Sequence, residues 1–145
     1  MIAPAAIEYY IPMQIPADSI ATSLPALGST LPAGSGYHHG SWHCFTAQDG
    51  LPSSIITQIL QDLRGDLWLQ TFNEGVGRYD GRQCTVFTAA DGLLHDNCWH
   101  MLADRRGHIW FATAGGLCRY DGRHFAHFAA ADGLGHDIVN NMCED

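Results

Sequence analysis

The chain has 145 residues, of which 46% are hydrophobic and 15% are charged, so its composition is that of one globular domain. The formal net charge of -8, with seven arginines and no lysine, argues against a basic patch that would hold a nucleic-acid backbone. No apolar run reaches the roughly 18 residues of a membrane-spanning helix, and residues 1–12 lack the positive start of a signal peptide.

Residues 1–36 are rich in Pro, Ala, Ser and Gly, and they are predicted to form a leader or linker with little regular structure. A repeated pattern follows. The segment 37–45 is expected to be the last strand of a partial unit, because Tyr37 precedes Tyr79 by one length of the repeat described next.

Three motifs recur at one spacing. FTAQDGL, FTAADGL and FAAADGL begin at Phe45, Phe87 and Phe128, so their interval is almost constant. DLRGDLWLQT begins at Asp62 and recurs as DRRGHIWFAT from Asp104, and GVGRYDGR begins at Gly75 and recurs as GLCRYDGR from Gly116. Three motifs that keep both their order and their spacing indicate a structural repeat.

Each unit contains four short apolar stretches separated by turn residues. In the first unit the predicted strands are 55–60, 67–70, 76–79 and 83–87. The Arg-Gly and Asp-Gly pairs between them supply the positive φ angles of tight hairpins. Four antiparallel strands in about 41 to 42 residues match one blade of a β-propeller, so the predicted fold is all-β.

The repeat also predicts the domain boundaries. Propeller repeats are expected over 37–145, with the partial unit at 37–45, blades at 46–87 and 88–128, and the first strand of a further blade within 129–145. Two whole blades cannot close a ring. The chain is therefore expected either to be a truncated product of a longer gene or to associate with further copies.

Four pairs of equivalent positions in the two units are predicted to have structural roles. Large rings suit the packing layer between blades, and an Asp before the first turn can accept hydrogen bonds from turn amides such as those of the glycines. These positions are Asp62, Gly65, Trp68, Tyr79, Asp104, Gly107, Trp110 and Tyr120. Cys84, Cys98 and Cys143 also align with apolar residues, which favours packing over redox chemistry.

His95-Asp96 and His136-Asp137 are repeat equivalents that directly follow the DGL motif, where the first unit has Ser53-Ser54. The loop leads from the outer strand of one blade to the inner strand of the next, near the channel mouth where ligands usually bind. The four His and Asp residues are therefore the predicted ligand-binding residues, and the alternative is that they cap the turn. The sequence predicts no catalytic residue, no metal site and no cofactor.

The segments FTAQDGLPSSIITQILQDLRGDLWLQTFNEGVGRYDG and FTAADGLLHDNCWHMLADRRGHIWFATAGGLCRYDG resemble the two-component regulator propeller repeat, over roughly residues 42–145. The resemblance implies part of a seven-bladed propeller in the extracytoplasmic, periplasmic sensor region of a hybrid histidine kinase. It further implies an unknown small molecule or carbohydrate as the ligand, and further blades as partners. This sequence departs from the family pattern at Gln70 and Ala112 after the tryptophans, and at Gly77 and Cys118.

Two other classes of function stay open. Some propellers with related periods resemble metal-dependent lyases that use His, and others are scaffolds that bind proteins. The chain contains no ATP-binding box, phosphoacceptor helix or receiver domain, so a ligand-sensing, non-catalytic propeller fragment is the predicted function.

Overall fold

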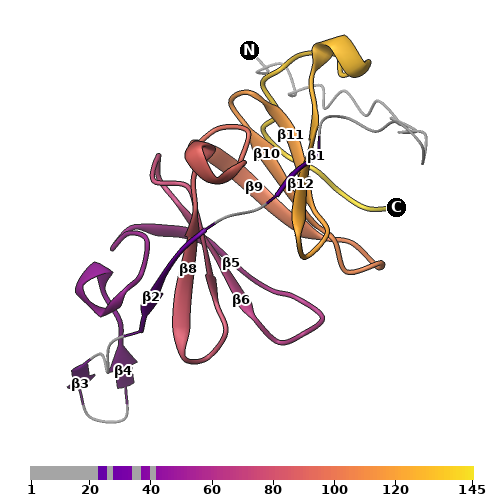
Figure 1. Cartoon of the computed structure of the whole chain (residues 1–145). Coiled ribbons are helices and arrows are strands. Elements are labelled where there is room, and N and C mark those ends of the chain that lie inside the picture. Colours follow the sequence, from indigo (N-terminus) through magenta and orange to yellow (C-terminus); the bar gives the residue numbers. More distant parts are fainter. Residues whose placement is uncertain (1–22, 26–27, 34–36, 40–41) are drawn as a thin grey trace, which may run out of the picture.

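The computed structural model describes residues 23–25, 28–33, 37–39 and 42–145 (Figure 1). In this part of the chain the regular structure is β-strand, apart from the short 3-10 turns η1 (Ala47–Asp49), η2 (Ala89–Asp91) and η3 (Ala130–Asp132). This content confirms the predicted all-β fold. The strands are β1 (Ser23–Pro25), β2 (Ser29–Pro32), β3 (Tyr37–His39), β4 (Trp42–Cys44), β5 (Ile56–Gln61), β6 (Leu67–Thr71), β7 (Val76–Tyr79), β8 (Gln83–Phe87), β9 (Cys98–Ala103), β10 (Ile109–Thr113), β11 (Gly116–Tyr120) and β12 (His124–Phe128).

Two sheets form the body of the molecule, and each is an antiparallel meander of four consecutive strands. The first sheet has the order β5-β6-β7-β8 and the second the order β9-β10-β11-β12. Their registers are equivalent: Trp68 lies opposite Leu60 and Arg78, and its repeat partner lies opposite the corresponding residues. We refer to these sheets as blade 1 and blade 2.

The turn between the first two strands of each blade requires glycine. Gly65 and Gly107 have φ angles of 91° and 85°, in the left-handed region that residues with a Cβ rarely adopt. Each glycine amide donates to the backbone carbonyl of the aspartate three residues earlier, at 3.0 Å. The DxxG pattern therefore closes a tight turn and reverses the chain.

The core lies between the blades, whose inner faces are both aromatic. Trp68 of blade 1 is fully buried, and its ring centroid lies 5.5 Å from that of Phe111 and 5.3 Å from that of Tyr120, both in blade 2. Phe87 packs on Tyr120 and Phe125 at 5.7 and 5.5 Å. Edge-on and tilted ring pairs at these distances add stabilisation beyond the apolar area that they bury.

Three of the five cysteines are buried, and two of them, Cys98 and Cys118, belong to this core. Cys84, Cys98 and Cys118 are buried, whereas Cys143 is exposed. Burial raises the pKa of the Cys98 and Cys118 thiols to about 12 and that of Cys84 to about 11. These thiols are therefore protonated at neutral pH and behave as small apolar side chains.

The N-terminal segment differs from the expectation of little regular structure over 1–36. Of these residues the structure describes 23–25 and 28–33, and they contain two strands. β1 pairs with β12 and β2 pairs with β8, so each blade has a fifth, outer strand. The outer strand of a blade exposes unpaired backbone groups that another strand can satisfy. Pro25 and Pro32 end these two strands, as proline can on a sheet edge.

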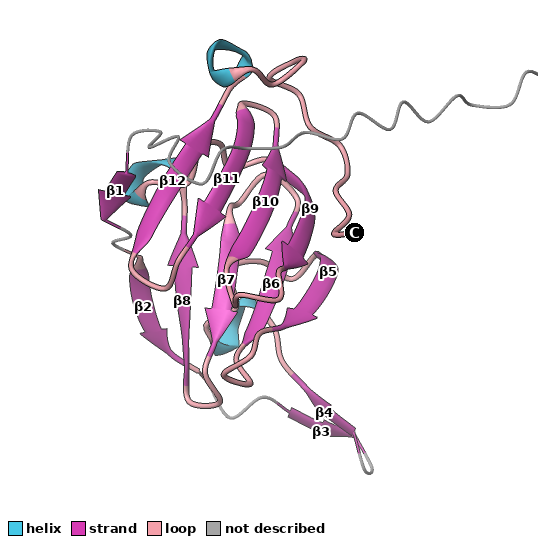
Figure 2. Cartoon of the chain, turned by 90° about the vertical axis from the view of Figure 1, so that its right-hand side faces the viewer, coloured by secondary structure: helices cyan, strands magenta, loops and turns pink. Residues whose placement is uncertain are grey.

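The segment 37–45 also differs from the expected single blade strand. β3 and β4 pair with each other as a separate hairpin, at the edge of the molecule in Figure 2. Phe45, just after this hairpin, lies 6.2 Å from the Tyr79 ring. The equivalent Phe87 lies 5.7 Å from Tyr120, so Phe45 occupies the place of a residue from a preceding blade.

The strand expected within 129–145 does not form. Residues 138–145 have no regular structure, although the amide of Val139 donates to the carbonyl of Thr113 at 3.2 Å. In blades 1 and 2 the first strand pairs with a second strand, and residues 138–145 have no such partner strand within the described ranges. Over the described residues, no helix is long and apolar enough to cross a membrane.

Candidate functional site

Asp62 organises the first turn of blade 1. Its Oδ1 accepts hydrogen bonds from the backbone amides of Arg64 and Asp66 at 2.8 and 3.0 Å. Its Oδ2 accepts from Nε1 of Trp68 at 3.0 Å. The carboxylate therefore accepts hydrogen bonds from turn amides, as expected. The amide of Gly65 is not among them, because it donates to the backbone carbonyl of Asp62 instead. The carboxylate also fixes the orientation of the buried tryptophan.

Asp104 has the same role in blade 2. Its Oδ1 accepts from the amides of Arg106 and His108, and its Oδ2 accepts from Nε1 of Trp110 at 3.0 Å. The His108 ring lies 2.9 Å from the same oxygen. Burial alone would raise the pKa of Asp104, but the hydrogen bonds from Trp110 and His108 outweigh it and lower the pKa below 3.8.

The loops that were predicted to bind a ligand make one repeated pair of hydrogen bonds. His95 Nδ1 accepts from the amide two residues later at 2.9 Å, and Asp96 Oδ1 accepts from the amide of Ala89 at 2.6 Å. His136 and Asp137 make the same two bonds, at 2.9 and 2.7 Å. In the described chain, no group of three or more His, Cys, Asp or Glu side chains could hold a metal ion.

The serines of the first loop complete this pattern. Ser53 Oγ accepts from the amide of Ile55 at 3.1 Å, and Ser54 Oγ accepts from the amide of Ala47, the first residue of η1, at 3.3 Å. One Ser-Ser pair and two His-Asp pairs thus serve the same turn. Ligand binding by His95, Asp96, His136 and Asp137 remains a prediction, since turn capping accounts for the bonds that these residues make.

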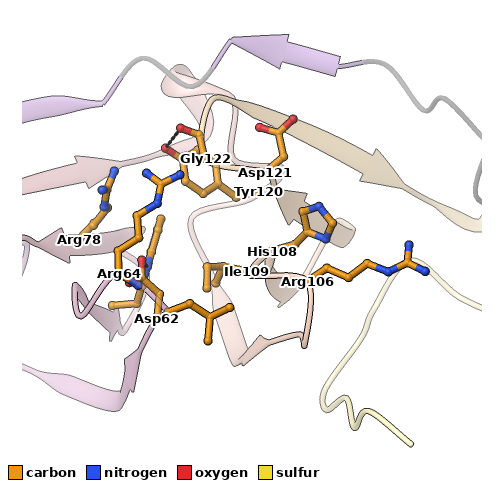
Figure 3. Close-up of a pocket in the computed structure, with 12 residues that line it drawn as sticks. Asp62, Arg64, Arg78, Arg106, His108, Ile109, Tyr120, Asp121 and Gly122 are labelled. Carbon is orange, nitrogen blue, oxygen red and sulfur yellow. Dashed lines mark hydrogen bonds between the residues drawn. The ribbon is translucent and has the colours of Figure 1, made fainter.

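A pocket of about 230 Å³ lies between the two blades, at the opposite end of the strands from these loops (Figure 3). It is formed by the DxxG turns of both blades and the turn between β11 and β12. We call it the junction pocket. It is lined by Asp62, Leu63, Arg64, Trp68, Arg78, Arg106, Gly107, His108, Ile109, Tyr120, Asp121 and Gly122.

Arg78, which lines the junction pocket, forms an ion pair with Asp66. Arg78 donates through Nε to Asp66 Oδ2 at 2.7 Å and through Nη2 to the same oxygen. Burial alone would lower the pKa of Arg78, but the hydrogen bond and the charge of Asp66 raise it. The Tyr120 hydroxyl donates to the carbonyl of Gly122 at 2.9 Å. Burial raises the pKa of Tyr120, while the charges of Arg78 and Arg64 act in the opposite direction.

Arg64 crosses from blade 1 to blade 2. Its Nη2 lies 2.8 Å from the position that a Cβ would take on Gly122, so a side chain there would collide with the guanidinium group. In the described part of the chain, neither Arg64 nor Arg106 has a carboxylate partner. The sequence reasoning did not single out these arginines. Both occupy the same position of the repeat, as the Arg before Gly in DLRGD and DRRGH. That equivalence could have drawn attention to them, but the repeat alone does not show which turns face each other.

Two stacked antiparallel sheets, each with a meander of four consecutive strands and joined by the loop from β8 to β9, are blades of a β-propeller. The family model described as two component regulator propeller matches residues 92–115, from the DGL loop to the turn between β10 and β11. This match confirms the resemblance seen in the repeat motifs.

A solved structure that shares this fold is the extracellular domain of BT4673 from B. thetaiotaomicron, which is described as a putative one component system. The two proteins are 22% identical, with a TM-score of 0.50 over 61% of this chain. The aligned part spans 12% of that chain, so this protein corresponds to a small portion of its neighbour. No curated protein sequence matches the chain.

Proposed function

We propose that this chain is a segment of the sensor propeller of a two-component signalling protein, located outside the cytoplasm and without catalytic activity of its own. The observation that carries the proposal is the match of residues 92–115 to the two component regulator propeller, within a pair of stacked blades. The fold that the chain shares with an extracellular domain supports the proposed location.

The proposed role of this segment is to bind a polar small molecule, and a carbohydrate is the class that the family resemblance implies. The junction pocket is the preferred site because it combines aromatic walls, such as Trp68 and Tyr120, with charged groups from both blades. A ligand there would contact blade 1 and blade 2 together. The loops with His95 and His136 are the second candidate, and their Nδ1 atoms are already used in turns.

The test is thermal unfolding and calorimetry of the full chain against neutral and charged monosaccharides, disaccharides and small organic acids. A ligand that binds the native state raises the unfolding temperature in a concentration-dependent way. We expect saturable binding that is reduced by Arg64→Ala and unaffected by the double change His95→Ala/His136→Ala. The reverse pattern would move the site to the loops. A folded chain that binds no member of the panel would contradict ligand sensing by this segment.

No observation favours the alternative of a metal-dependent enzyme, because the described residues bring no three metal-ligating side chains together. Exposed apolar side chains among the described residues, such as Ile55, Ile59 and Leu63, do not by themselves favour the alternative of a protein-binding scaffold. The sensor role is therefore the function that the fold and the repeat support best.

A further inference from the structure

The junction pocket is lined by the carboxylates of Asp62 and Asp121 and by the guanidinium groups of three arginines. Both carboxylate oxygens of Asp62 accept hydrogen bonds from its own turn and from Trp68. Asp121 Oδ1 accepts from the amides of the second and third residues after it, at 2.8 Å each. Arg78 is neutralised by Asp66, whereas Arg64 and Arg106 have no carboxylate partner among the described residues.

Two guanidinium groups converge in this pocket. Figure 3 shows Arg64 and Arg78 extending from blade 1 toward Tyr120 and Gly122 of blade 2, while Arg106 points away from them. Both Arg64 and Arg78 act electrostatically on the Tyr120 hydroxyl, which places their charges around the same point. Asp66 pairs with Arg78, and the charge of Asp62 also acts on Arg78, whereas Arg64 has no carboxylate partner among the described residues.

We propose that the junction pocket binds a small oxyanion, a carboxylate or a phosphate, between Arg64 and Arg78. This inference rests on the proposed function and names the chemical class of its ligand. A guanidinium group presents a planar fork of N–H donors that matches two oxygens of either anion. Trp68 and Ile109, which are buried, give the pocket an apolar wall, and a charge-assisted hydrogen bond beside such a wall is stronger than one in bulk water.

The same geometry disfavours other ligands. A cation would meet the guanidinium group of Arg64, which has no carboxylate partner among the described residues, and both oxygens of Asp62 already accept hydrogen bonds. A neutral sugar would leave Arg64 without a partner of opposite charge. An oxyanion, by contrast, would link Arg64 and Arg78 of blade 1 through one group that lies against Tyr120 of blade 2.

The experiment is isothermal titration of the full chain at constant ionic strength with inorganic phosphate, glucuronate and neutral glucose. Constant ionic strength is needed because salt screens exposed charges. We expect phosphate and glucuronate to bind with one-to-one stoichiometry, and glucose to bind at least about tenfold more weakly, since one charge-assisted pair is worth at least that factor. The phosphate and glucuronate arms show whether the site prefers one oxyanion over the other.

Variants locate the site. Arg64→Ala should weaken oxyanion binding by at least about tenfold, and Arg64→Lys, which keeps the charge but loses the fork, should weaken it less. Arg105→Ala is the matched control, because Arg105 lies outside the pocket next to Glu144 and its loss removes the same charge. Circular dichroism of each variant tests whether it is folded. We expect the Arg64 variants to fold, because Arg64 forms no ion pair with another described residue.

Equal binding by the wild type and Arg64→Ala, or equal binding of glucose and glucuronate, would overturn the oxyanion assignment. Binding of glucose without either oxyanion would overturn it as well, yet leave ligand sensing by the segment standing. Failure of all three probes, together with the wider panel above, would contradict both proposals. The two failures are therefore distinguishable.

Discussion

Asp62 and Asp104 each hold a turn and a tryptophan with one carboxylate. In each carboxylate, Oδ1 accepts hydrogen bonds from the turn amides and Oδ2 accepts one from the indole N–H of the tryptophan. Because both partners are donors, the position requires an acceptor on both branches, which only Asp supplies at this length. The recurring Asp-Gly-Trp spacing thus has a single physical cause within each blade.

Because the pKa of Asp104 is lowered, its contribution to the free energy of unfolding depends on pH. The folded-state pKa lies below 3.8, so the carboxylate contributes stability that is present above 3.8 and is lost as the pH falls through the folded-state pKa. Asp104→Asn keeps one acceptor but opposes an N–H donor to the Trp110 indole. We expect it to lower the free energy of unfolding by about 1–3 kcal/mol at pH 7, with the difference shrinking in acid. Urea unfolding at several pH values measures this.

The matched control is Asp145→Asn, which removes the same charge from an exposed residue at the end of the chain. Its unfolding curves should follow those of the wild type at every pH, because surface substitutions away from specific contacts have small effects. A constant loss for Asp104→Asn from neutral pH down to acid would show that the Asp104 charge does not contribute to stability.

At the scale of the strands, the predicted segments 67–70, 76–79 and 83–87 correspond closely to β6, β7 and β8. Strand formation there follows from local residue types and from glycines at positive φ, which the repeat displays twice. The strands β1 and β2 could not be predicted in the same way. Their pairing with β12 and β8 joins residues far apart in sequence, and short proline-bounded segments contain no signal of a distant edge.

The junction pocket was not predictable for a similar reason. Repeat alignment shows that Arg64 and Arg106 are equivalent, but it does not show which of them faces another blade. Arg64 points into the junction pocket because blade 2 packs against its side of blade 1. Position 66 is Asp in blade 1, where it neutralises Arg78, and its equivalent in blade 2 is His108, so the two units differ in charge where their backbones agree.

The loops with the predicted ligand residues provide an element-scale prediction. Ser54 and Asp96 accept from equivalent amides at the start of η1 and η2. Asp96→Ser should therefore retain the turn and change the free energy of unfolding by less than about 0.5 kcal/mol, whereas Asp96→Ala, which removes the acceptor, should lower it by about 1 kcal/mol. Urea unfolding of the pair measures the difference. Equal losses in the two variants would contradict the turn-capping role of Asp96.

At the scale of the whole molecule, the two blades are joined by polar as well as aromatic contacts. The Gln58 side chain donates through Nε2 to the carbonyl of Met101 at 2.9 Å and accepts from its amide through Oε1 at 2.8 Å. It thus links the inner strands of both blades. Its repeat equivalent, His100, has a buried Nδ1 without a hydrogen-bond partner in the described residues. The difference follows from the missing strand structure in 138–143, where the next partner backbone would lie.

The tryptophans test this junction directly, because they are equivalent in sequence and differ in surroundings. Both donate to an Asp, but Trp68 lies between the blades and is fully buried, whereas Trp110 lies on the outer face of blade 2 beside Phe128 and is partly exposed. Trp68→Ala should lower the free energy of unfolding by about 3–5 kcal/mol, and Trp110→Ala by at least about 1 kcal/mol less. Urea unfolding followed by circular dichroism measures both free energies. If an alanine variant does not fold, Trp68→Phe and Trp110→Phe are compared instead.

The indole hydrogen bond to Asp is lost in both changes. The difference between the two losses of stability therefore reports the packing of blade 1 on blade 2. Equal losses would mean that the blades do not pack on each other in solution.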